Sequence, residues 1–521
     1  MAGFAVSVNG WFSDVHRGKT ARRNEGRQWM LFFGACCASV LLTNSQAQQP
    51  TELIVRNGLI VTAEGRLEGD LRIRGETIAE IGRNLSATGA REIDARGMLV
   101  VPGGVDPHTH LVPELPNPPR PNANQDDYVS GSQGALAGGV TTVSNFIGLG
   151  TDEVSAFATR VIGQVQKSGI ADFFIHVSMG NDPTRFTQPA TLKEMADRGF
   201  TSTGEDFLAN LSFDRNALGF YKAFKASGAA GVVSMLHCED ASILADSRET
   251  MVAEGRGSLH NVGQSAPIIA EVVAVQRGVA IAEATGAPVY ILHTSSGRAL
   301  RVAEEAISRG LPVYVETRPV YLHLTEEVYL RPDVGLFMGT PMLREKRDQD
   351  ALWEGIAKGT VHTIGSDHTA FSKEAKLDPT QTVANMRAGF NNLQDYRPML
   401  YSDGVVTGRI TLEQFVNVTA TNPAKIFGMY PRKGVIQVGS DADVVIWDPT
   451  MKKTIRDQDE FSNAKYSTYA GRQVTGFPVI TIRRGEVVYE NGNVTGKPGT
   501  GKFIPQGRFQ RPRLRETSSF D

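Results

Sequence analysis

Two histidines separated by one residue, His108 and His110, follow a short apolar run at residues 98–102. Side chains alternate along a β-strand, so both imidazoles are expected to point to the same side. Two neutral imidazoles placed in this way can bind one divalent transition-metal ion. The pair alone does not decide between a metal site and a structural or coincidental pair of histidines.

Three later segments also place a possible metal ligand directly after an apolar, strand-like run. Residues 231–237 end in His237, residues 287–293 end in His293, and residues 361–367 end in Asp367. In a (β/α)8 barrel the carboxyl ends of the strands form one face, so ligands from different strands converge there. A single histidine after a strand is more often structural, but repetition at four strand ends favours a shared metal site.

The elements between these motifs fit such a barrel. Helix-like stretches at residues 268–285 and 300–309 alternate with the strand-like runs, which is the pattern of a parallel sheet. Residues 101–434 are therefore predicted to form the barrel. Residues 52–100 and 435–490 contain short alternating runs typical of hairpin strands. Residues 491–521 are basic and rich in proline, glycine and arginine, and we expect an extended tail.

Further motifs occur in a specific order along the chain. They are Asp126-Asp-Tyr128, Gly138-Gly-Val-Thr-Thr142, Glu316-Thr-Arg-Pro-Val-Tyr321, Pro341-Met-Leu-Arg344 and Asn422-Pro-Ala-Lys-Ile-Phe-Gly428. With the strand-end motifs, this set resembles the amidohydrolase superfamily, and within it the hydantoinase/dihydropyrimidinase branch. The resemblance covers roughly residues 52–505.

The resemblance implies a fold, a cofactor and a reaction. The fold would be α/β, a (β/α)8 TIM-like barrel with a small β-sandwich domain built from both chain ends. One metal would be held by His108, His110 and Asp367, and the other by His237 and His293. Zinc is the expected ion, two per subunit, although manganese, cobalt or iron would also suit these ligands. Asp367 would be the general base in hydrolysis of an amide-like C–N bond, and the subunits would form a dimer or tetramer.

The segment that should supply the bridge between the two metals departs from the hydantoinase pattern. That branch uses a carbamylated lysine, whereas residues 199–210 contain no lysine. If one residue is inserted, Glu205 falls in the place of the lysine, and its carboxylate could bridge directly. The alternative puts Gly204 there with Glu205 turned away, which would leave a one-metal or damaged site.

Two more departures concern substrate binding. Asn210 stands where hydantoinases have a tyrosine that hydrogen-bonds the reacting carbonyl, and an asparagine has a shorter reach. Arg318 replaces a small residue, so its guanidinium could hold a substrate carboxylate or could form a structural ion pair. Dihydroorotases bind a substrate carboxylate through an arginine two residues after the His-x-His, where this chain has Val112.

The composition is that of a globular enzyme. The chain has 521 residues and a formal net charge of −2, which leaves no basic footprint for nucleic acid or for an anionic membrane. We therefore expect no nucleic-acid partner and no stable membrane insertion once the leader is removed. The resemblance implies a small-molecule amide substrate.

The N-terminus has the layout of a secretory leader. Arg22, Arg23 and Arg27 precede an apolar segment at residues 29–42, and small residues suited to cleavage follow near Ala47. We predict a signal peptide over residues 1–47 and export to a periplasm. The alternative is a mis-assigned start, with Met30 the true one and a cytoplasmic protein.

Three functional hypotheses remain open at this stage. The leading one is a metal-dependent cyclic amidohydrolase. The second is an amidohydrolase acting on linear N-acyl or N-carbamoyl amino acids, which Arg318 would suit. The third is a catalytically silent scaffold of the dihydropyrimidinase-related kind, which the presence of all the candidate ligands disfavours.

Overall fold

The structure is a computed structural model, and it describes residues 52–117, 120 and 123–511. Its centre is an eight-stranded parallel barrel in which the strands follow one another in chain order. The strands are β6 (Gly104–Asp106), β7 (Val140–Gly148), β8 (Asp172–Ser178), β9 (Ser202–Phe207), β10 (Val233–His237), β11 (Val289–Ile291), β12 (Val313–Thr317) and β13 (Thr363–Ile364). The predicted barrel is confirmed.

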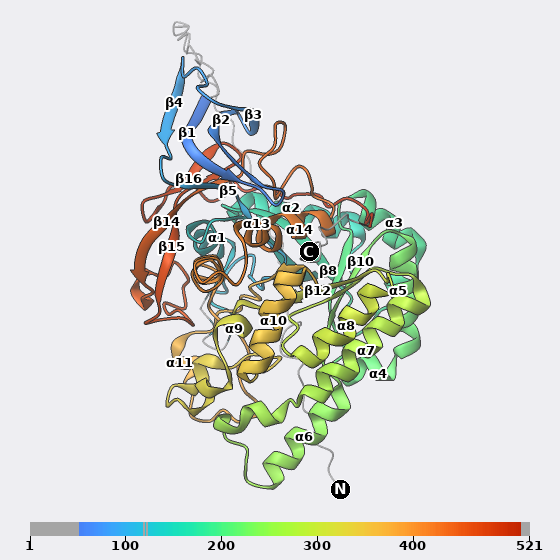
Figure 1. The fold of residues 1–521 in the computed structure, drawn as a ribbon. Coiled ribbons are helices and arrows are strands. Elements are labelled where there is room, and N and C mark those ends of the chain that lie inside the picture. Colours follow the sequence, from blue (N-terminus) through green and yellow to red (C-terminus); the bar gives the residue numbers. More distant parts are fainter. Residues whose placement is uncertain (1–51, 118–119, 121–122, 512–521) are drawn as a thin grey trace, which may run out of the picture. The chain divides into compact units, whose positions relative to one another are not determined.

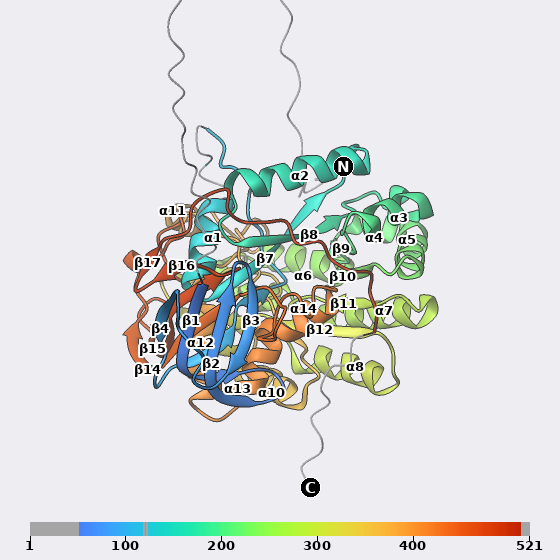
Figure 2. The same cartoon turned by 90° about the horizontal axis from the view of Figure 1, so that it is seen from above.

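Helices surround the barrel, as the alternating pattern predicts. Strands such as β10 and β12 are buried along their whole length, because helices or the barrel interior cover both faces. Figure 2 shows β7 to β12 along an arc, with α2, α3, α5, α7 and α8 outside it. The larger helices are α1 (Tyr128–Ala137), α2 (Val154–Ser168), α3 (Pro189–Asp197), α5 (Ala217–Ala229), α6 (Ala241–Ala253), α7 (Ile268–Thr285), α8 (Gly297–Ser308) and α10 (Lys346–Lys358).

Shorter helical segments fill the connections. They are α4 (Leu211–Arg215), α9 (Pro319–His323), α11 (Lys373–Lys376), α12 (Tyr396–Leu400), α13 (Leu412–Val416) and α14 (Asn422–Ile426). Short 3-10 helices are η1 (Thr184–Thr187), η2 (Leu259–Ser265), η3 (Glu326–Leu330), η4 (Val334–Phe337) and η7 (Asp457–Asp459), and η5 (Tyr401–Val405) and η6 (Asn417–Thr421) are π-helical. Among the described residues no single helix is long and apolar enough to cross a membrane; η2 and α7 together meet that test by length and composition, with a 40° bend between them.

The barrel closes between its last and first strands through residues that carry candidate ligands. The backbone nitrogen of Asp367 donates to the carbonyl of His108 over 2.7 Å, and the nitrogen of His110 donates to the carbonyl of His368 over 2.9 Å. The closure therefore fixes the His-x-His segment and Asp367 against each other.

A second sheet is built from both ends of the described chain (Figure 1). Its strands are β1 (Glu52–Val61), β2 (Arg66–Arg74), β3 (Thr77–Gly82), β4 (Ala90–Asp94), β5 (Leu99–Pro102), β14 (Val444–Thr454), β15 (Gln473–Arg483), β16 (Glu486–Glu490) and β17 (Asn493–Val494). The two ends join where β14 pairs antiparallel with β5, and a separate apolar cluster lies on this sheet. The prediction of a β domain made from both chain ends is confirmed, in the form of one mixed sheet.

The chain after β17 runs extended along the amino ends of the barrel strands. Ile504 and Gln506 donate backbone hydrogen bonds to Phe173 and Gly199 at 2.7 and 2.9 Å, and Phe509 donates to Gly231 at 2.7 Å. This part of the tail packs on its own barrel. The predicted leader over residues 1–47 lies outside the described residues.

Candidate metal centre

The first group of candidate ligands, His108, His110 and Asp367, lies where the barrel closes. The Nε2 atoms of the two histidines are 3.1 Å apart. Oδ1 of Asp367 lies 3.2 Å from Nε2 of His108 and 3.0 Å from Nε2 of His110. The structure therefore brings together three of the predicted ligands from opposite ends of the barrel sequence.

The second group is formed by Glu205, His237 and His293. Oε1 of Glu205 lies 3.0 Å from Nδ1 of His237 and 3.0 Å from Nε2 of His293. All three side chains are buried. In each of the two groups the candidate ligand atoms lie within 4.8 Å of one another.

Glu205 faces both groups. While Oε1 lies against His237 and His293, Oε2 lies 3.6 Å from Nε2 of His110 and 4.0 Å from Nε2 of His108. Of the two arrangements left open by the sequence, the structure shows the one in which Glu205 points into the site.

An extra residue in β9 turns Glu205 inward. Against β10, Thr203 pairs with Ser234 and Asp206 with Leu236, so β9 advances one residue more than its neighbour. This bulge re-aims the side chains that follow it. Gly204 occupies the bulge with φ of +145°, and a Cβ there would lie 2.7 Å from Cβ of Met235. Only glycine combines that conformation with so close an approach.

Two further carboxylates orient the histidines. Glu316 accepts from Nδ1 of His108 at 2.8 Å and from the backbone nitrogen of His293 at 3.1 Å. Glu239 lies 2.8 Å from Nε2 of His237 and accepts a hydrogen bond from the Thr340 hydroxyl at 2.6 Å. Such carboxylate–histidine pairs fix the ring orientation and the tautomer of a metal ligand.

The sequence reasoning gave these two carboxylates no role. Glu239 stands two residues after His237, a spacing that puts both on one face of an extended chain. That spacing could have predicted a contact between Glu239 and His237. For Glu316 the sequence showed only that it opens the motif Glu316-Thr-Arg-Pro-Val-Tyr321, which does not predict its contact with His108.

Arg318 is buried beside Asp367. One guanidinium nitrogen lies 3.0 Å from Oδ2 of Asp367 and donates to the carbonyl of Thr340 at 3.2 Å. The guanidinium also lies over the ring of Phe390, 4.8 Å from its centre. The structure therefore shows an ion pair at Arg318; a role in holding a substrate carboxylate stays a prediction.

The carboxylates of the site carry the negative charge that a metal centre requires. Burial alone would raise the pKa of Glu205, but hydrogen bonds from His237 and His293 hold that pKa well below its usual value. Burial also opposes ionisation of Asp367, yet the charges of Arg318 and His108 hold its pKa well below the usual range. Burial would lower the pKa of His237, but Glu205 and Glu239 raise it to about 9. Both carboxylates are thus anionic near neutral pH.

Asn210 lies at the start of α4. Its side-chain oxygen accepts from the backbone nitrogen of Ser212 at 2.9 Å, and its amide nitrogen donates to Asn181 at 3.0 Å. It caps a helix in this arrangement, and its predicted contact with a substrate carbonyl stays a prediction.

The donor atoms fit divalent ions. Each group offers two imidazole nitrogens and a carboxylate oxygen, the ligand types that zinc and similar metals prefer. Glu205 offers one oxygen to each group, as a bridging carboxylate would.

Comparison with known proteins agrees with this site. Residues 99–488 match the model of the amidohydrolase family. The chain belongs to this family. It is 34% identical to the D-hydantoinase of Ralstonia pickettii over 88% of this chain and 100% of the relative, and 32% identical to the D-hydantoinase of Geobacillus stearothermophilus over 88% and 97%. The predicted amidohydrolase is confirmed.

Solved structures are similar over the same region. The dihydropyrimidinase from Brevibacillus agri superimposes with a TM-score of 0.81 at 32% identity, over 89% of this chain and all of that one. The L-hydantoinase from Arthrobacter aurescens gives a TM-score of 0.78 at 29% identity, over 87% and 99%. The amidohydrolase thus shares its fold, over nearly 90% of the chain, with a dihydropyrimidinase and an L-hydantoinase.

Proposed function

We propose that this amidohydrolase opens cyclic amides of the hydantoin or dihydropyrimidine type by hydrolysing a ring C–N bond, using two divalent metal ions, zinc by preference. The observation that carries the proposal is the position of Glu205, whose two oxygens face the two ligand groups. The similarity to hydantoinases over nearly 90% of the chain supports the substrate class.

His108, His110 and Asp367 would hold one ion, His237 and His293 the other, and Glu205 both. Ions held there would acidify a water molecule and polarise the amide carbonyl. Asp367 would accept the proton of the attacking water and return it to the leaving nitrogen. Glu316 and Glu239 keep His108 and His237 in the orientation that presents a ligand nitrogen.

Metal content and turnover together test this function. Chain lacking residues 1–47 is loaded with zinc, dialysed, and assayed against hydantoins, dihydropyrimidines and N-acyl amino acids. The proposal expects about two zinc ions per chain and turnover of a cyclic amide that Asp367→Asn lowers at least about 100-fold. Undiminished turnover in Asp367→Asn would refute the general-base assignment, and a chain that binds no metal would favour the silent scaffold.

A second substrate class is favoured by one observation. Arg318 adds a buried positive charge next to Asp367, and its Nε has no hydrogen-bond partner within the described chain. A guanidinium in such a site can pair with a carboxylate. Linear N-acyl or N-carbamoyl amino acids are therefore the alternative substrates.

Arg318→Ala separates the two classes. If Arg318 binds a substrate carboxylate, KM rises at least about tenfold for acidic substrates and little for neutral hydantoins. An equal effect on both would discard the carboxylate role.

We also propose export to a periplasm and assembly into dimers or tetramers. Cell fractionation tests the first, and light scattering tests the second.

A further inference from the structure

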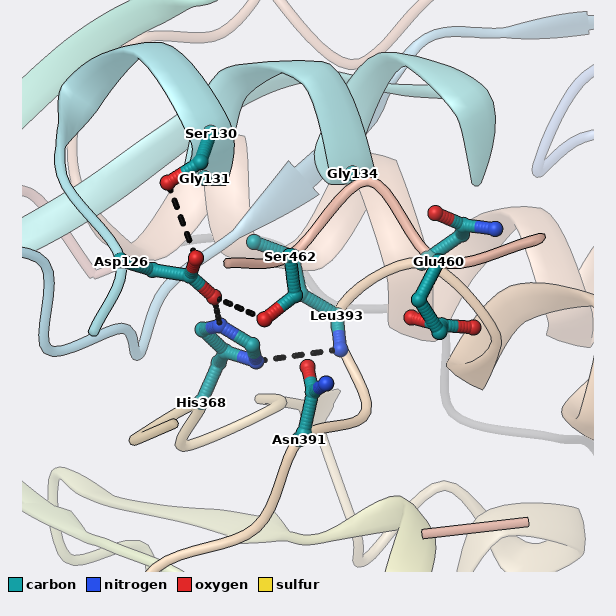
Figure 3. Close-up of a pocket in the computed structure, with 10 residues that line it drawn as sticks. Asp126, Ser130, Gly131, Gly134, His368, Asn391, Leu393, Glu460 and Ser462 are labelled. Atoms are coloured by element: carbon teal, nitrogen blue, oxygen red, sulfur yellow. Dashed lines mark hydrogen bonds and ion pairs between the residues drawn. The ribbon is translucent and has the colours of Figure 1, made fainter. Parts of the chain in front are cut away.

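A second polar cluster lies behind the segment that carries Asp367. Its members are Asp126, His368 and Ser462, which meet in a small cavity at the amino end of α1 (Figure 3). Asp126 is fully buried, and the other two are nearly so. None of the three belongs to the two ligand groups.

The backbone at Asp367 needs support. Its φ is +48°, in the left-handed region that residues other than glycine rarely adopt. A conformation of this kind persists only where the surrounding structure over-determines it. The backbone bonds of Asp367 to His108 and of His110 to His368 hold one side of the segment.

The ring of His368 holds the other side. Its Nδ1 accepts from the backbone nitrogens of Asn392 at 3.4 Å and Leu393 at 3.3 Å, so this nitrogen carries no proton. Nε2 must then carry the proton, and it donates to Oδ2 of Asp126 at 2.8 Å. The ring is bonded at both nitrogens, so the residue that follows Asp367 is fixed.

Asp126 is fully engaged as an anion. It accepts from Ser462 Oγ at 2.6 Å, from the backbone nitrogen of Asn463 at 2.7 Å and from Ser130 Oγ at 2.9 Å, besides His368. Burial alone would raise the pKa of Asp126, but the hydrogen bond and charge of His368 and the other donors lower it. Through this one carboxylate the segment at 366–368 is tied to α1 and to residues 462–463.

We propose that Asp126, acting through His368, is a positioning residue that holds Asp367 in place for the metal ion at His108 and His110. The inference rests on the proposed metal centre, and it adds a residue whose hydrogen bonds go to His368, Ser462, Asn463 and Ser130 and to none of the candidate ligand side chains. Loss of the Asp126 carboxylate should loosen one of the two ion sites and leave the Glu205 group intact.

The test is Asp126→Asn in the full barrel, with zinc as the probe. The amide keeps the shape of the carboxylate, but its NH2 must face a donor, either the fixed Nε2–H of His368 or the backbone N–H of Asn463. We expect one of the two zinc ions to bind about tenfold more weakly, so that dialysed protein holds closer to one. Added zinc should restore kcat with KM unchanged. Ser462→Ala is the matched control. It removes one donor from Oδ2 of Asp126, the oxygen that also accepts from His368, and it should keep both ions.

Two comparisons make the result decisive. Asp126→Asn combined with Asp367→Asn should bind zinc no worse than Asp367→Asn alone, because both changes affect one site. His368→Phe, which keeps a ring but has neither hydrogen bond, should reproduce the loss. Retention of both ions in Asp126→Asn with only a lower melting temperature would overturn the inference. A wild-type chain that binds two ions but hydrolyses no cyclic amide would refute the proposed function alone.

Discussion

At the scale of residues, the site divides the oxygens of its carboxylates between different tasks. Glu205 offers one oxygen to each ligand group, whereas Asp367 turns Oδ1 to the histidines and Oδ2 to Arg318. A carboxylate paired with a guanidinium is a weaker base than a free one. Arg318 therefore lowers the basicity of Asp367, the residue that we propose as the general base.

The histidines make metal binding depend on pH. The pKa of His237 is raised to about 9 by Glu205 and Glu239 against the effect of burial, and that of His108 is raised well above its usual value by Asp367 and Glu316. Below these values both rings are protonated, so an entering ion must displace a proton from each. Zinc loading at pH 7 should release one proton from each of these two rings, besides any proton lost by metal-bound water, measured calorimetrically in buffers of different ionisation enthalpy. His237→Gln should release about one proton fewer than the wild type, and release of none in the wild type would contradict these protonation states.

Removal of the guanidinium should raise the basicity of Asp367. Burial raises the pKa of Asp367, and the Arg318 charge is the foremost cause that lowers it. In Arg318→Met that pKa rises, so the base becomes protonated, and activity is lost, at a higher pH than in the wild type. The acid limb of the kcat/KM profile should therefore move to higher pH. Arg301→Met, which removes an exposed arginine of α8, is the control and should leave the limb in place; an unmoved limb in Arg318→Met would separate Arg318 from the base.

At the scale of elements, the bulge in β9 decides whether a carboxylate faces both ligand groups. The extra residue turns Glu205 toward the histidines, and β9 and β10 approach so closely there that Gly204 has no room for a side chain. One glycine thus links the register of two strands to the chemistry of the centre.

Gly204→Ala should damage both stability and metal binding. The new Cβ would meet Cβ of Met235 at 2.7 Å and its carbonyl oxygen at 2.9 Å, in a conformation that alanine rarely adopts. We expect the free energy of unfolding to fall by about 1–3 kcal/mol and zinc content to drop. Urea unfolding and metal analysis measure the two effects. Gly163→Ala, in open space on α2, should instead leave stability equal or raise it by up to about 1 kcal/mol; the same response in both variants would contradict the role of the bulge.

The sequence predicted the elements better than it predicted their partners. His108, His110, His237, His293 and Asp367 were found because each follows an apolar strand, and barrel geometry brings strand ends together. Glu205 needed an assumed insertion, since a bulge leaves no periodic signal. Glu316 and Asp126 received no role, because each supports its histidine through a contact between distant segments. Glu239 also received no role, although its position two residues after His237 was a usable signal. A structural ion pair was one of two alternatives for Arg318, and only the fold identifies Asp367 as its partner.

At the scale of the whole molecule, a buried ionic cluster ties the terminal sheet to the barrel. Lys433 is fully buried and lies 2.7 Å from Asp172 at the start of β8 and 2.7 Å from Asp443 before β14. Arg484, between β15 and β16, lies 3.0 Å from Asp172. Burial would raise the pKa of Asp172, but the charges of Lys433 and Arg484 lower it to about 2.

Breaking this cluster should destabilise the whole described body. Lys433→Met removes the positive charge that lies 2.7 Å from both Asp172 and Asp443 and leaves Asp172 paired with Arg484. Loss of one partner from a buried ion pair typically costs about 3–5 kcal/mol. Urea unfolding should show that loss, whereas Arg91→Ala, at an exposed pair with Glu490 on the sheet, should cost less than about 1 kcal/mol. Comparable losses in the two variants would show that the cluster does not join the two sheets energetically.

The central claim is that Glu205 bridges two metal ions, and anomalous diffraction from zinc-loaded crystals tests it most directly. The account predicts two zinc peaks about 3.5–4 Å apart, one at His108, His110 and Asp367 and the other at His237 and His293, with a Glu205 oxygen about 2.0–2.2 Å from each. A single peak, or two peaks with Glu205 turned away from both, would contradict it.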